Sequence, residues 1–141
     1  MKTKKILIVE DNQFYGHLLK TKLERITDAE VLLMENGEEV INITHIHPEL
    51  VFLDYNLETM NGIDVLKEIK STYPDIHIVM LSGQEKMKVA IEALKYGATD
   101  YLIKGVDDSD EALSRIIKDC ERISLEGTKK KGFKNLLSIL F

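Results

Sequence analysis

Five short apolar runs alternate with five amphipathic segments, and this alternation limits the possible folds more than any other feature of the sequence. The apolar runs lie over 4–9, 29–34, 50–53, 76–81 and 100–104. Most are continuous rather than alternating, which is typical of strands covered on both faces in a parallel sheet. Apolar residues recur at helical spacing over the intervening segments, which are 14–26, 37–47, 62–72, 85–96 and 109–126.

Local end signals support these helical segments. Pro48 and Pro74 follow two of them, Gly97 is a C-cap candidate, and Ser109 can cap the last helix at its start. Because strand–helix–strand connections are right-handed, the pattern predicts an α/β fold with a doubly wound, five-stranded parallel sheet. We expect the flavodoxin-like strand order 2-1-3-4-5, with helices on both faces.

The bulk composition suits one globular domain and excludes several classes of protein. The chain has 141 residues, of which 44% are hydrophobic and 30% charged. Its net charge of −5 argues against nucleic-acid binding through the whole surface. The single cysteine, Cys120, cannot form an internal disulfide, and the apolar run over 6–9 is too short for a signal peptide or membrane span. We therefore expect a cytoplasmic protein.

Polar residues gather where the predicted strands end. Glu10 and Asp11 follow the first strand, Asp54 ends the third, Ser82 ends the fourth and Lys104 ends the fifth. The carboxyl ends of parallel strands meet at one edge, and ligands bind there where the strand order reverses. The sequence thus predicts three carboxylates, a hydroxyl and an ammonium in one small space.

This set of groups suits phosphoryl chemistry on a hard divalent cation. Carboxylates held together repel one another unless a cation is present, and Mg²⁺ takes carboxylate oxygens and phosphate together. A carboxylate can attack phosphorus, while a lysine and a hydroxyl stabilise the transferred group. Each residue taken alone is more simply explained as a helix cap, a turn residue or a solvated charge. Their convergence on one edge favours a site.

The chain resembles the response regulator receiver family over about residues 4 to 125. The resemblance rests on short stretches at the strand ends, namely Ile6 to Asn12, Leu53 to Leu57, Asn61-Gly62, Leu81 to Gly83, Gly97-Ala98 and Asp100 to Lys104. It implies a stand-alone receiver domain over 1–126, followed by a basic amphipathic tail over 127–141.

By position, the resemblance also implies roles for the acidic residues. Asp54 matches the phosphoacceptor and Asp11 matches a direct Mg²⁺ ligand. Glu10 matches an acidic neighbour that acts on the metal through water. The backbone carbonyl of Asn56 matches a further metal ligand.

The same resemblance implies a switch and contains one departure. Ser82 matches the switch hydroxyl, Tyr101 the switch aromatic, and Lys104 the lysine that contacts the phosphoryl group. The family usually has a proline after this lysine, joined by a cis bond, whereas this chain has Gly105. Since a cis bond before a non-proline residue costs about 2.5–4 kcal/mol, we expect a trans bond here.

The implied function is a signalling switch rather than a metabolic enzyme. Asp54 would accept a phosphoryl group from the phosphohistidine of a histidine kinase or phosphotransfer protein and later lose it by hydrolysis. Phosphorylation would switch the face formed by 85–96, 100–104 and 109–126, which a downstream protein or a second copy would recognise. No direct DNA binding is expected.

Two other functions remain open. A phosphorylation-independent docking module would keep the fold without using the acids. A phosphatase or mutase with an aspartyl nucleophile usually has a second acid close after the first and a cap domain; here Asn56 occupies that position and no insertion is long enough for a cap.

The tail over 127–141 combines four lysines with an apolar stripe at i, i+3, i+4, i+7 and i+8. Packing onto the receiver, or a dimer contact, is the favoured interpretation. Contact with a membrane or another partner is the alternative.

Overall fold

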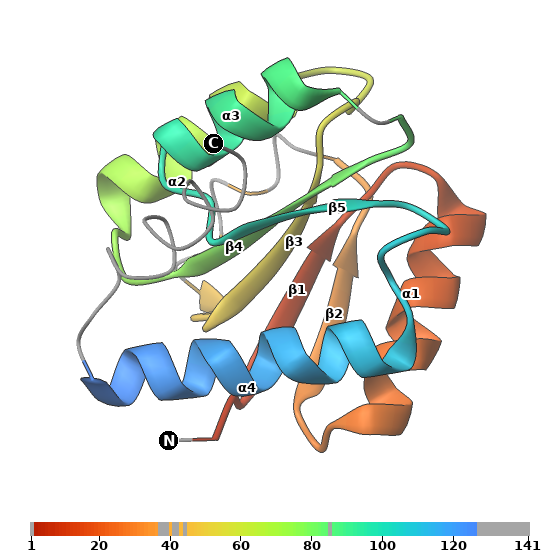
Figure 1. Cartoon of the computed structure of the whole chain (residues 1–141), viewed down its shortest axis with the longest axis vertical. Helices are drawn as coiled ribbons and strands as arrows, with labels where there is room; N and C mark the ends of the chain where they lie inside the picture. The colour runs from red at the N-terminus through yellow and green to blue at the C-terminus, as the bar shows by residue number, and fades with distance from the viewer. Residues whose placement is uncertain (1, 37–39, 41–42, 44, 85, 127–141) are drawn as a thin grey trace.

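The computed structural model describes residues 2–36, 40, 43, 45–84 and 86–126. Its centre is one parallel sheet in the order β2-β1-β3-β4-β5, as the sequence predicts (Figure 1). The strands are β1 (Lys5–Val9), β2 (Glu30–Met34), β3 (Leu50–Asp54), β4 (His77–Ser82) and β5 (Asp100–Ile103).

Helices cover both faces of this sheet. They are α1 (Gln13–Ile26), α2 (Gly62–Thr72), α3 (Met87–Lys95) and α4 (Asp110–Glu126). Figure 1 shows α2 and α3 on one face, and α1 and α4 on the other. The doubly wound α/β fold is therefore confirmed.

The continuous apolar strands contribute side chains to two separate hydrophobic layers, one on each face of the sheet. In β1, Leu7 and Val9 pack with α2 and α3, while Ile6 and Ile8 pack with α1 and α4. The central strands β3 and β4 are buried along their whole length. Full burial of an aliphatic side chain stabilises by about 1.5–3 kcal/mol, so both faces contribute to the stability of the sheet.

Side-chain caps begin three of the helices. Asn12 accepts from the Tyr15 amide at 3.0 Å, and Asn61 accepts from the Ile63 amide at 2.7 Å. Ser109 accepts from the Ala112 amide at 3.2 Å, as its sequence position predicts. These caps satisfy amide groups that have no partner within the helix. Gly97 has a φ of 104°, which suits the helix end predicted there.

Two predicted segments lie partly or wholly outside the described residues. The helix expected over 37–47 falls largely on residues that are not described, although Val40 and Ile43 are described and buried. The tail over 127–141 lies wholly outside them. Among the described residues, no helix is long and apolar enough to cross a membrane.

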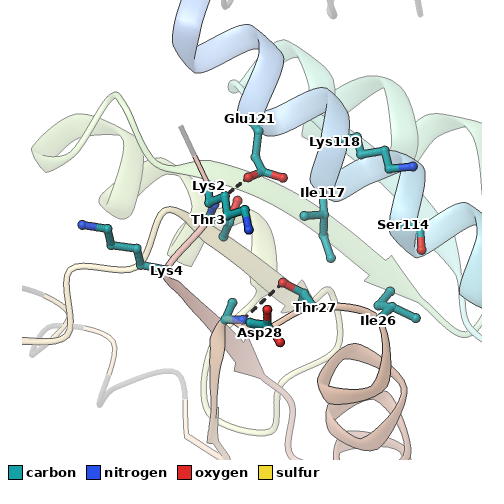
Figure 2. A pocket seen from close by; sticks show the side chains of 11 residues that line it. Lys2, Thr3, Lys4, Ile26, Thr27, Asp28, Ser114, Ile117, Lys118 and Glu121 are labelled. Carbon is teal, nitrogen blue, oxygen red and sulfur yellow. Dashed lines mark hydrogen bonds between the residues drawn. The ribbon is translucent and has the colours of Figure 1, made fainter.

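A cavity of about 640 Å³ lies at the amino ends of the strands, between the N-terminal segment, the end of α1 and α4 (Figure 2). Across it, the Thr3 amide donates to Glu121 at 2.8 Å. Lysines and acids are mixed along its wall, which includes Lys2, Lys4, Asp28, Lys118 and Glu121. This cavity is at the opposite end of the sheet from the predicted convergence of acids.

Gly62, the first residue of α2, lies directly against the backbone that follows β3. Its amide donates to the Tyr55 carbonyl at 2.9 Å. A Cβ atom added there would lie 2.4 Å from the Asp54 carbonyl oxygen and 2.7 Å from the Tyr55 Cα. Backbone atoms cannot move aside like a flexible side chain, so only glycine fits this contact.

We therefore expect Gly62→Ala to lower the free energy of unfolding by about 2–4 kcal/mol. Urea denaturation of the variant measures this change. Gly83→Ala is the matched control, because a Cβ atom at Gly83 has no neighbour within 4 Å. Equal stability of the two variants would contradict the close approach at Gly62.

His77, the first residue of β4, is a buried histidine that must remain neutral. It is 4% exposed, and burial followed by the charge of Lys70 lowers its pKa to about 4. The unfolded chain takes up a proton at this side chain near pH 6.5, whereas the folded chain resists protonation until about pH 4. Stability contributed by the neutral ring is thus complete above pH 6.5 and is lost as the pH falls toward 4.

We expect His77→Gln to reduce the loss of stability between pH 6.5 and 4.5 by roughly 2–3 kcal/mol relative to the parent chain. Denaturant midpoints measured across this range provide the comparison. If the stability of His77→Gln falls with pH as steeply as that of the parent chain, the His77 ring is not the group responsible for the loss of stability.

Candidate functional site

The carboxyl edge of the sheet brings together three acidic side chains. β1 pairs directly with β3, so the residues that follow Val9 lie beside Asp54 at the end of β3. Carboxylate oxygens of Glu10, Asp11 and Asp54 all lie within 4.8 Å of one another. Glu10 is fully buried and Asp54 is 2% exposed, whereas Asp11 is half-buried. We call these three residues the acidic cluster.

Lys104 brings a positive charge to the acidic cluster from the end of β5. Its Nζ lies 3.1 Å from Asp54 Oδ1 and also forms an ion pair with Glu10 Oε1. The Lys104 amide donates to the Ser82 carbonyl at 2.8 Å, which fixes its backbone beside β4. Residues from three of the four predicted strand ends therefore meet in the structure.

The electrostatics of the site follow from burial and from these contacts. Burial, and then the neighbouring Asp54 carboxylate, raise the pKa of Glu10 to about 7 despite the opposing effect of Lys104. Burial alone would lower the pKa of Lys104, but Glu10 and Asp54 outweigh it and raise that pKa. Lys104 therefore stays charged. Ionisation of Glu10 beside the Asp54 carboxylate is unfavourable, because the two negative charges repel each other in a buried place.

Backbone amides orient each carboxylate of the acidic cluster. The Asn12 amide donates to Glu10 at 3.2 Å, and the Asn56 amide donates to Asp54 at 3.2 Å. The Glu58 amide donates to Asp11 at 2.9 Å. Each carboxylate keeps acceptor positions for a further partner, because a carboxylate has about four of them.

This donor set fits a hard divalent cation. Three carboxylates at such spacing repel one another, and one ammonium balances only part of their charge. Oxygen ligands of this kind suit Mg²⁺, which binds one or two carboxylates and keeps waters or phosphate oxygens. The loop after Asp54 carries Asn56, which is bridged to Asn61 and is held close to the acidic cluster by its own amide.

Ser82 and Tyr101 meet at a common acceptor instead of at the acidic cluster. The Ser82 hydroxyl donates to the Gln84 carbonyl at 3.0 Å, and the Tyr101 hydroxyl donates to the same carbonyl at 2.9 Å. Ser82 is buried and Tyr101 is half-buried. Both predicted switch residues are thus linked through the loop between β4 and α3.

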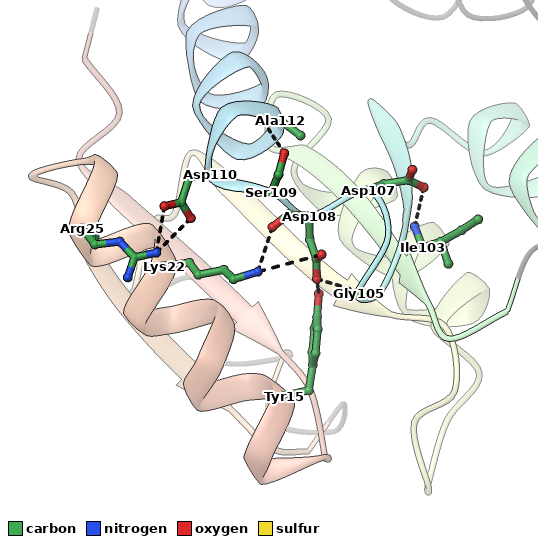
Figure 3. Close-up of polar contacts among 10 residues, drawn as sticks. All are labelled: Tyr15, Lys22, Arg25, Ile103, Gly105, Asp107, Asp108, Ser109, Asp110 and Ala112. Carbon is green, nitrogen blue, oxygen red and sulfur yellow. Dashed lines mark hydrogen bonds and ion pairs between the residues drawn. The ribbon is translucent and has the colours of Figure 1, made fainter.

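The sequence did not predict a second set of contacts behind Lys104. Tyr15 and Asp108 are hydrogen-bonded there, and Asp108 also accepts from the Gly105 amide (Figure 3). The replacement of the usual proline by Gly105 was the available signal, because it restores an amide donor at this position. All peptide bonds of the described residues are trans, including the one before Gly105.

Sequence comparison identifies the family to which these features belong. A profile of the response regulator receiver domain matches residues 6–117. Chemotaxis protein CheY of Thermotoga maritima is 32% identical over 118 residues, which cover 82% of this chain and 98% of CheY. Regulatory protein LuxO of Vibrio cholerae is 34% identical over 98 residues, which cover 69% of this chain but only 21% of LuxO.

Solved structures share the same architecture. A response regulator receiver domain protein from Clostridium thermocellum matches with a TM-score of 0.77 and 30% identity over 86% of this chain and 98% of its own. The signal receiver domain of a LuxO repressor protein from Vibrio parahaemolyticus has a TM-score of 0.79 over 90% of this chain and 96% of its own. At 24% identity, the second match supports the fold alone. The chain belongs to the response regulator receiver domain family of two-component signalling.

Proposed function

We propose that Asp54 accepts a phosphoryl group from the phosphohistidine of a histidine kinase or phosphotransfer protein in a Mg²⁺-dependent step. The observation that carries this proposal is the burial of Asp54 within the acidic cluster, with Lys104 3.1 Å from its Oδ1. A carboxylate used only as a cap or turn residue does not need two further acids and an ammonium around it.

Asp11, Asp54 and the Asn56 carbonyl would hold the metal directly, and Glu10 would act on it through water. When bound, Mg²⁺ neutralises negative charge on the transferring group and on the acids around it. Asn56 and Glu58 contribute amides that hold Asp54 and Asp11 in place before the phosphoryl donor arrives. This preorganisation avoids rearranging the site during the reaction.

The transfer exchanges one bond at phosphorus for another. An oxygen of Asp54 attacks the phosphorus atom, the phosphorus–nitrogen bond to histidine breaks, and its electron pair stays on the imidazole nitrogen. Lys104 stabilises charge on the phosphoryl oxygens from the side of β5. Water later breaks the phosphorus–oxygen bond, which releases inorganic phosphate and regenerates the Asp54 carboxylate.

The switch would depend on the Gln84 carbonyl, which accepts hydrogen bonds from both Ser82 and Tyr101. Ser82 cannot direct its single hydroxyl proton to Gln84 and to a phosphoryl oxygen at once. Once Ser82 turns toward the phosphoryl group, Tyr101 remains as the side-chain donor to that carbonyl. The loop and Tyr101 then move inward together, and the face formed by α3, β5 and α4 changes for a downstream partner.

We expect incubation with acetyl phosphate and Mg²⁺ to add one phosphoryl group to the chain. Attack by Asp54 forms a mixed anhydride, and intact mass spectrometry at mildly acidic pH detects it. Asp54→Asn should abolish the mass increase, because the amide is not a nucleophile. Removal of Mg²⁺ with a chelator should have the same effect.

Asp64→Asn is the matched control, because Asp64 is an exposed acid on α2 and should not affect the reaction. Unlabelled parent protein, with fast hydrolysis excluded by rapid quenching, would contradict the proposal and favour a phosphorylation-independent docking module. Labelling that persists in Asp54→Asn would place the acceptor elsewhere.

A further inference from the structure

We propose that Asp108 is a positioning residue for Lys104, acting through Tyr15 and the Gly105 amide. These three residues are called the lysine bracket below. The inference rests on the proposed contact of Lys104 with the phosphoryl group. It adds contacts that fix this lysine besides its ion pairs with the acidic cluster.

The first half of the lysine bracket holds the backbone that follows Lys104. The Gly105 amide donates to Asp108 Oδ2 at 2.9 Å, and Asp108 is 4% exposed. Gly105 has a φ of 77°, a left-handed conformation that glycine adopts with little strain. The peptide unit that carries Lys104 is therefore fixed by a buried carboxylate only three residues further along the chain.

The second half holds an aromatic ring beside the ammonium of Lys104. The Tyr15 hydroxyl donates to the same Asp108 Oδ2 at 2.6 Å, and the Lys104 Nζ lies 5.1 Å from the centroid of the Tyr15 ring. A cation at this distance from an aromatic face is attracted to it. One carboxylate oxygen thus anchors both the backbone of Lys104 and a contact of its charged end.

Lys22 connects the lysine bracket to the rest of α1 (Figure 3). Its Nζ donates to the Asp108 carbonyl at 3.1 Å and lies 4.0 Å from Asp108 Oδ1. Burial alone would raise the pKa of Asp108, but the bonds from Tyr15 and Gly105, with the charge of Lys22, lower it. Asp108 is therefore a charged acceptor at neutral pH, and such hydrogen bonds are about twice as strong as neutral ones.

The physical need for such a device lies in the lysine side chain itself. Lysine has many rotamers, and fixing a buried one loses conformational entropy. Ion pairs with Glu10 and Asp54 also hold the ammonium, but Asp54 is the group that changes when a phosphoryl group arrives. The lysine bracket contacts Lys104 from groups that take no part in that change.

The test compares rates of Asp54 phosphorylation by acetyl phosphate at saturating Mg²⁺ in the full chain. Asp108→Ala removes both acceptor contacts, and we expect the rate constant to fall by about tenfold because Lys104 is misplaced. Asp108→Asn keeps an oxygen that can accept from Gly105 and Tyr15, so it should restore most of the rate.

Asp110→Ala is the matched control for loss of an acid in this region. Asp110 pairs with Arg25 across the same α1–α4 boundary but belongs to a largely exposed ion pair. We expect its rate to stay within about twofold of the parent rate, since exposed pairs contribute little. A similar slowing in Asp110→Ala and Asp108→Ala would overturn the inference.

A double variant tests whether Asp108 acts through Lys104. Lys104→Met should slow phosphorylation by about tenfold or more, and adding Asp108→Ala should change that rate by less than about twofold. If the two substitutions slow phosphorylation by factors that multiply in the double variant, Asp108 acts independently of Lys104 and the positioning role is overturned. If the parent is not phosphorylated, the proposed function fails together with the inference. If Lys104→Met reacts at the parent rate, the inference fails while Asp54 remains the phosphoacceptor.

Amide hydrogen exchange at Gly105 gives a readout that does not depend on activity. We expect slow exchange in the parent and in Asp108→Asn, and at least about tenfold faster exchange in Asp108→Ala. Circular dichroism confirms that each variant is folded. Unchanged exchange in folded Asp108→Ala would show that Asp108 does not hold this amide.

Discussion

The structure depends on one unfavourable arrangement, which is the confinement of three carboxylates around a single ammonium at the edge of the sheet. Glu10 and Asp54 are almost completely buried there, and Lys104 contacts both. A buried charge is costly unless it is paired and hydrogen-bonded, so this cluster requires a rigid frame to persist. The apolar layers of the sheet and the close contact at Gly62 supply this rigidity.

Apolar layers on both faces of the sheet provide the rigidity. Phe52 and Leu53 point to opposite layers just before Asp54, and both are fully buried. The carboxylate at the end of β3 is therefore carried by a strand that cannot shift without breaking both layers. The glycine at position 62 allows the following loop to return against this strand, where a side chain would collide with backbone.

Much of this site could be predicted from the sequence, because strand ends follow from apolar patterning. The positions of Glu10, Asp11 and Asp54 at one edge require only a parallel sheet in which β1 and β3 are neighbours. Boundaries differed by a residue or two: β5 ends at Ile103, so Lys104 is the first residue after the strand instead of its last. Such ends depend on backbone hydrogen bonds that periodicity does not reveal.

The partners of other side chains could not be assigned from local sequence. The hydroxyl of Ser82 was expected to face Asp54, yet its hydrogen bond goes to the Gln84 carbonyl. The contact between Tyr15 and Asp108 joins residues 93 positions apart in the sequence. Side-chain partners of this kind are selected by tertiary packing, so they become visible only when the helices are placed on the sheet.

The acidic cluster and Lys104 together form the proposed site for a phosphoryl group and Mg²⁺. The most direct measurement is a crystal structure of the chain grown with Mg²⁺ and beryllium fluoride, which mimics a phosphoryl group on a carboxylate. We predict the analogue on Asp54, with Lys104 and Ser82 contacting it and the metal bound to Asp11. An analogue bound elsewhere, or a metal remote from the acidic cluster, would contradict the account.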